Sequence, residues 1–146
     1  FSVRETIIAL LLASEPLSGP IRTQLCLAFS GIAAHVPGSE WHGVGAVAWI
    51  EHRLAGEPKP LSLVRLVEII CILAEEAGSY KPAVHPTRRR EYYEELETSS
   101  PKAFQLLTAA AQEPALLQDG KSLKYILQAF SSWLNLAGPQ KLKESF

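Results

Sequence analysis

The chain has 146 residues, enough for one ordinary domain or for two to three helical repeats of about 40–47 residues. Its 14 lysines and arginines nearly balance 15 aspartates and glutamates, which argues against a domain built to neutralise nucleic-acid phosphates. Its 2 cysteines form no C-x-x-C pair, and its apolar runs are far shorter than the roughly 20 residues of a membrane span. We therefore expect a folded fragment of a larger protein, without disulfides, membrane insertion or direct nucleic-acid binding.

The first half of the chain predicts helices separated by short turns. Apolar residues recur at spacings of three and four, and the breaks between these runs contain proline or glycine. Pro20 and Pro60 suit the first position of a helix, where the missing N–H costs nothing, and Ser39 is placed to cap a helix. The predicted helices cover residues 3–13, 20–36, 41–54 and 60–77.

The second half predicts a polar helix followed by two apolar ones. Thr87 to Glu97 favours a helix, and Pro101 after Ser100 predicts either a kink or a new helix start. A further helical face ends at Glu113 and Pro114. The last strong helix covers residues 121–137, with Asp119 as its expected cap and Gly138 at its end.

No run alternates apolar and polar residues in the way a strand does, so the predicted fold class is all-α. Two long helices start at Pro20 and Pro60, and this interval of 40 residues lies in the range of HEAT repeats. We expect a HEAT-type α-α superhelix, although an irregular helical bundle is the alternative. The approximate units are 1–17, 18–56, an enlarged 58–115 and a truncated 118–146.

Support for enzyme chemistry is weak, and we predict no catalytic, cofactor-binding or metal site. His35 and His42 flank a turn, but a zinc site needs more ligands at suitable spacing. Cys26 lies beside an apolar stripe and is expected to be a small buried hydrophobe rather than a nucleophile. The three tryptophans are expected to pack between stacked helices.

The densest charged segment is residues 88–97, in which three arginines are followed by four glutamates. Two tyrosines lie between the first and the second of these glutamates. Arg90 with Glu94 and Arg88 with Glu91 have the spacing of ion pairs within one helix. The segment is therefore either a solvated helix face or a docking surface, since arginine and tyrosine are favoured at interfaces. The glutamates make a nucleic-acid surface the weaker interpretation.

Several strings, in the right order over most of residues 18–138, resemble importin-β-type nuclear transport receptors. Residues 22–29 are similar to an early repeat of the exportin-1 and importin-like group. Residues 63–76, the 88–100 segment and the Ser-Trp-x-Asn-Leu string at 132–136 are similar to transportin-SR, also called transportin-3, and to importin-13. Pro101 departs from the family pattern, in which this helix usually runs on.

The resemblance implies a receptor that binds Ran-GTP and nucleoporins and carries cargo, typically serine/arginine-rich splicing factors, between cytoplasm and nucleus. It also implies that the second helix of each repeat lines the concave side; here these are residues 3–13, 41–54 and 87–112. Exposed residues on these helices are the expected Ran contacts: Glu51, Arg53, Arg89, Glu91, Tyr92, Glu94 and Glu95. Two other functions stay open: a HEAT-like scaffold without GTPase binding, and a sister receptor with different cargo.

Overall fold

The computed structural model describes residues 3–13, 18–36, 41, 45–59, 61–78 and 84–146. These residues contain helices and turns and no strand, so the all-α prediction is confirmed. The helices are α1 (Val3–Leu11), α2 (Gly19–His35), α3 (Gly45–Leu54), α4 (Leu61–Ala77), α5 (Pro86–Ala111), α6 (Pro114–Leu117), α7 (Gly120–Ala137) and α8 (Pro139–Glu144).

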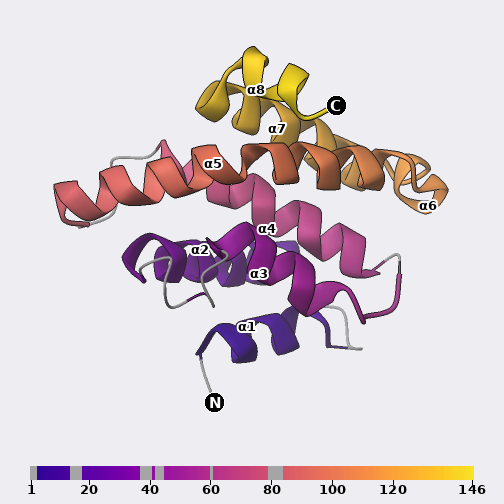
Figure 1. The fold of residues 1–146 in the computed structure, drawn as a ribbon. Helices are drawn as coiled ribbons and strands as arrows, with labels where there is room; N and C mark the ends of the chain where they lie inside the picture. Colours follow the sequence, from indigo (N-terminus) through magenta and orange to yellow (C-terminus); the bar gives the residue numbers. More distant parts are fainter. Residues whose placement is uncertain (1–2, 14–17, 37–40, 42–44, 60, 79–83) are drawn as a thin grey trace.

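The helices are stacked in two layers. Helices α2, α4 and α7 contact one another in succession and form one layer, while α3 and α5 lie beside them and contact each other in the second layer. Figure 1 shows the stack running from α1 at one end to α8 at the other, with the long α5 crossing it. This arrangement is the extended solenoid predicted from the sequence rather than a closed bundle.

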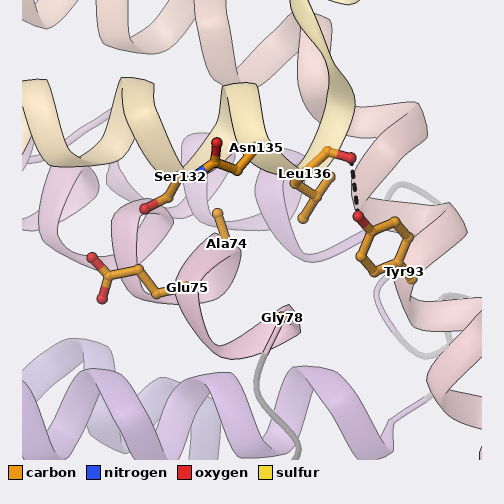
Figure 2. Close-up of a pocket in the computed structure, with 7 residues that line it drawn as sticks. All are labelled: Ala74, Glu75, Gly78, Tyr93, Ser132, Asn135 and Leu136. Carbon is orange, nitrogen blue, oxygen red and sulfur yellow. Dashed lines mark hydrogen bonds between the residues drawn. The ribbon is translucent and has the colours of Figure 1, made fainter.

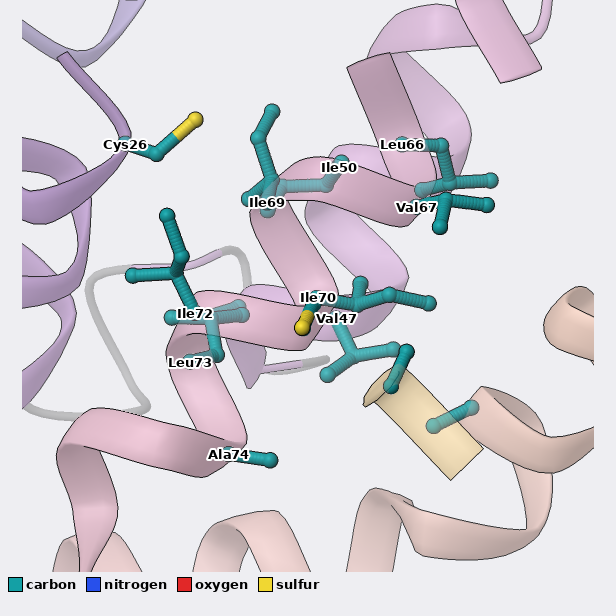
Figure 3. Packing of buried hydrophobic residues seen from close by; sticks show 14 of the residues in the cluster. Cys26, Val47, Ile50, Leu66, Val67, Ile69, Ile70, Ile72, Leu73 and Ala74 are labelled. Atoms are coloured by element: carbon teal, nitrogen blue, oxygen red, sulfur yellow. The ribbon is translucent and has the colours of Figure 1, made fainter. Parts of the chain in front are cut away.

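Helix α4 forms the centre of the core. Every residue from Arg65 to Ala74 is buried, because α2, α3, α5 and α7 all pack against this one helix. Figure 3 shows its apolar side chains directed toward several neighbouring helices, with Cys26 of α2 approaching from one side. Cys26 is buried, as predicted, and burial raises the pKa of its thiol to about 12.

The three tryptophans are buried in the core, as predicted. Trp41 and Trp49 lie edge to face, 5.3 Å between ring centroids, and both contact Phe29 of α2. The guanidinium of Arg4 lies 4.5 Å from the Trp41 centroid and so ties α1 to this cluster. Trp133 donates from its indole N–H to the carbonyl of Ile70 at 2.9 Å, which fixes α7 against α4.

The ends of the helices follow local sequence signals. Asp119 accepts hydrogen bonds from the Lys121 backbone N–H and the Ser122 hydroxyl, so its predicted capping role at α7 is confirmed. Gly138 has φ +84°, a conformation suited to glycine, and its N–H bonds the Leu134 carbonyl to end α7. The short helices α6 and α8 begin at prolines, Pro114 and Pro139, which suit the first position of a helix.

Of the two alternatives expected at Pro101, a kink or a new helix start, the new start is wrong, because α5 runs without a break from Pro86 to Ala111, a length of 26 residues. A proline cannot donate to the carbonyl four residues before it, which is that of Glu97. The buried hydroxyl of Ser100 donates to this carbonyl instead, at 2.6 Å. The substitute donor explains how the helix tolerates the proline. For α3, the predicted cap Ser39 and residues 42–44 lie outside the described residues, and the described helix covers Gly45–Leu54.

Candidate partner-binding surface

The first half of α5 carries the charged segment and presents one face to the core. His85 accepts from the Thr87 N–H at 3.2 Å, and Pro86 occupies the first helical position, so the helix start is well defined. The buried positions recur every three or four residues and anchor α5 to the rest of the stack. They are Tyr92, Leu96, Ser100, Ala103, Phe104, Leu107 and Ala110.

Arg88 clamps α5 onto the end of α2. Its guanidinium donates to the carbonyls of Ala34, at 3.0 Å, and Val36, at 2.7 Å, and it also reaches Ala33. These carbonyls lie at a helix C-terminus, where the backbone lacks internal donors and a positive charge is favourable. Glu95 holds the other side of the guanidinium at 2.9 Å. Both charged side chains therefore serve the packing of α5.

Two further ion pairs join the helices of the second layer. Glu51 of α3 pairs with Lys102 of α5 at 3.2 Å, and Arg53 of α3 pairs with Glu5 of α1 at 2.8 Å. The hydrogen bond to Glu5 is the main reason that the pKa of Arg53 is raised above its ordinary value. Arg53 also bonds Glu57 at 3.0 Å. Glu51 and Arg53 therefore link neighbouring helices and are only partly available to a partner.

The structure separates the expected Ran-contact residues into two groups. Tyr92 is only 5% exposed, so the expectation that its side chain lies at the surface is wrong; burial also raises its pKa. Glu91 and Glu94 are exposed, and Arg89 is half-buried nearby. The predicted local pairing is found between Arg88 and Glu91, at 3.7 Å, whereas no ion pair joins Arg90 to Glu94 among the described residues.

A surface groove of about 540 Å³ lies between the end of α4 and the beginning of α5. Its charged lining comes from the 88–97 segment, and Tyr93 forms part of its wall. Of the two adjacent tyrosines, Tyr92 was an expected contact residue and Tyr93 was not. The helical register distinguishes the two tyrosines, because Tyr92 lies four residues before Leu96 on the apolar stripe, whereas Tyr93 lies off this stripe. The lining residues are Ala77, Val84, Pro86, Arg89, Arg90, Tyr93, Glu94 and Glu97.

Metal ligands do not converge in the described part of the chain, where no group of three or more candidate side chains is found. His35 contacts the Gly31 carbonyl of its own helix at 2.8 Å, and His42 lies outside the described residues. None of the described helices is both long and apolar enough to cross a bilayer. The described surface of α5 carries exposed charges, and a groove lies beside them.

Comparison with known proteins identifies the kind of protein that carries this surface. A family model described as Exportin 1-like protein matches residues 18–143. The chain belongs to this family. It is also 29% identical over 134 residues to Transportin MOS14 of Arabidopsis thaliana, an alignment that covers 92% of this chain and 13% of that protein. The chain therefore spans about an eighth of the length of this relative.

Family membership confirms the resemblance to importin-β-type nuclear transport receptors at the level of the whole group. It groups the chain with a family of transport proteins rather than with enzymes. The match begins at residue 18 and so includes every helix from α2 to the start of α8.

Proposed function

We propose that the receptor containing this segment is a transportin-SR-like import receptor, and that this segment contributes to binding Ran-GTP. Its cargo would be serine/arginine-rich splicing factors, and it would shuttle between cytoplasm and nucleus through contacts with nucleoporins. The observation that carries the proposal is the family match over residues 18–143 together with the similarity to a transportin. The exposed charges of α5 supply a candidate surface.

The contacts described above narrow the candidate surface to Glu91, Glu94 and Arg89, with Arg90 and Glu97 beside them. Glu91 keeps 57% of its side chain exposed and pairs with Arg88 only at 3.7 Å. Charges at the rim of an interface mainly steer the approach of a partner and set its register. Glu95 is a poorer candidate, because its carboxylate already holds the Arg88 clamp.

Binding of Ran would change the affinity for cargo by changing the curvature of the repeat array. Small rotations between repeats add along a solenoid, so a partner at one end changes the curvature of a distant surface. Ran and cargo that prefer different curvatures would then oppose each other, which is reciprocal coupling between two sites. The clamps at Arg88 and Arg53 lie at such joints between helices and would transmit the rotation.

The test is the affinity of the full-length receptor for GTP-locked Ran after charge reversal at Glu91→Lys and Glu94→Lys. We expect affinity to fall at least tenfold, because the reversal places two positive charges where two negative ones now face the partner. The matched control reverses Glu113 and Glu144, which lie at and beyond the end of α5. It should leave affinity within about twofold.

Equal affinities for the wild-type receptor and the Glu91/Glu94 variant would rule out this site. A wild-type receptor that binds Ran in neither nucleotide state would instead favour the scaffold alternative. A receptor that binds Ran-GTP but does not bind serine/arginine-rich proteins would be a sister receptor with other cargo.

A further inference from the structure

A second hollow, which the Ran proposal does not use, lies between α4, α5 and α7. It has a volume of about 340 Å³ and is lined by residues of the last turns of α4 and α7, together with Tyr93 of α5. Figure 2 shows Glu75 and Ser132 toward one end of this cleft, Tyr93 at the other, and Ala74 between them. The cleft is therefore elongated and has chemically different ends.

The Ser-Trp-x-Asn-Leu string at 132–136 builds one wall of the cleft. Trp133 points into the core, where it is fully buried and bonds the Ile70 carbonyl. Ser132 and Asn135 are three residues apart on the helix and so share a face, and both line the cleft. The tryptophan in this string thus has a packing role, while the polar residues beside it line the cleft.

The electrostatic character of the cleft is negative. Glu75 contributes a carboxylate, and the Cys71 thiol donates to its Oε1 at 3.3 Å, which steadies the side chain. The last turns of α4 and α7 both reach the cleft, and helix C-termini carry partial negative charge. Among the residues that the structure describes, no lysine, arginine or histidine lines it. An anion would be repelled from this site, whereas a cation would be attracted.

The shape of the cleft favours a long side chain with a charged tip. Ala74, Gly78 and Leu136 give its middle an apolar or backbone character, and the polar groups lie toward the Glu75 end. Tyr93 donates its hydroxyl to the Leu136 carbonyl at 3.1 Å, which fixes the opposite wall. An arginine has an apolar stem of three methylenes and a head with five N–H donors, so it matches both parts.

We infer that this cleft accepts an arginine side chain from a partner protein, with its guanidinium on Glu75 and Ser132 and its stem along Ala74 and Leu136. Arginine suits the site better than lysine, because its planar head can donate to several acceptors at once. The inference does not depend on Ran binding, and it holds whether or not the Glu91 and Glu94 surface proves to contact Ran.

The experiment measures binding of a fluorescein-labelled peptide of alternating glycine and arginine to the full-length receptor by fluorescence anisotropy, at physiological salt and without Ran. Glu75→Gln should weaken binding about tenfold, since it removes one charge-assisted contact. Glu76→Gln removes the same charge from the neighbouring residue, which does not line the cleft, and should change affinity less than twofold. The same peptide with lysine for arginine should bind several-fold more weakly.

Asn135→Asp provides a variant with the opposite expected sign. It adds a second carboxylate to the wall beside Ser132, so it should strengthen binding of the arginine peptide. Equal losses in Glu75→Gln and Glu76→Gln would show that the peptide senses only general charge and would overturn the inference. Unchanged binding in Asn135→Asp would also contradict it, and equal affinity for the lysine peptide would overturn the assignment to arginine.

Discussion

Helices α4 and α5 follow each other in the chain and contact each other, yet they relate to solvent in opposite ways. From Arg65 to Ala74 no residue of α4 is exposed, whereas α5 buries one stripe and turns charged residues such as Arg90 and Glu94 outward. A helix that is buried on all sides is held by neighbours on all sides, while an amphipathic helix leaves one face exposed. Within one segment, α4 therefore supports the stack and α5 offers the surface.

The same comparison shows that charge does not by itself mark a binding surface. Arg65 on α4 is buried and donates to the Leu11 carbonyl at 3.0 Å, at the C-terminal end of α1, and to Glu68 at 2.7 Å. Arg88 on α5 does the same at the end of α2. Both arginines close the end of a helix that comes from another part of the chain.

Burial raises the pKa of Glu68, although the positive charges of Arg65 and Arg22 act in the opposite direction.

The largest expected effect comes from the core face of α4. Ile70→Ala should lower the free energy of local opening of α4 by about 2–5 kcal/mol, because it leaves a cavity where the side chain is fully buried. Amide hydrogen exchange in the full-length receptor measures this quantity. Leu127→Ala on α7 removes an apolar side chain that is 62% exposed and should cost less than about 1 kcal/mol. Equal costs would mean that α4 is not the centre of the core.

A smaller effect is expected at the clamp between α2 and α5. Arg88→Ala should destabilise the contact by about 2–3 kcal/mol, because the carbonyls of α2 and the Glu95 carboxylate lose their partner. Faster exchange at the start of α5 would report the loss. Arg90→Ala, on the exposed face of the same helix, should stay within about 0.5 kcal/mol. If Arg88→Ala and Arg90→Ala lowered the stability equally, Arg88 would act as a surface charge and would not hold α5 against α2.

The smallest effect concerns the proline inside α5. Ser100→Ala removes the donor to the Glu97 carbonyl and should cost about 1 kcal/mol, whereas Thr98→Ala on the exposed face should be nearly neutral. Adding Pro101→Ala should recover the loss, since the new backbone N–H can bond the same carbonyl. Amide hydrogen exchange rates in the helical turns around residue 100 measure the local stability of each variant. A double variant no more stable than Ser100→Ala would refute this compensation.

Most of the architecture followed from local patterns. The spacing of apolar residues predicted the long helices to within a few residues, and the Asp119 cap and the Gly138 stop were both correct. The residue pattern alone did not decide whether α5 continues past Pro101, because the continuation depends on where the Ser100 hydroxyl points. A rotamer choice of this kind is decided by packing rather than by residue type.

The candidate surface was predictable only in part. The sequence indicated the charged segment but could not separate Arg88 from Arg90, because the carbonyls that bind Arg88 lie more than 50 residues earlier in the chain. Tyr92 could have been recognised as buried from its register with Leu96. The cleft at Glu75 joins residues of three helices, so no local pattern predicts it.

The contrast between α4 and α5 is tested most directly by amide hydrogen exchange of the full-length receptor with and without GTP-locked Ran. The account predicts slower exchange in the 88–97 segment of α5 when Ran is bound, and little change at the already protected centre of α4. Protection confined to other helices, or no change at 88–97 under saturating Ran, would contradict the assignment of α5 as the partner-binding surface.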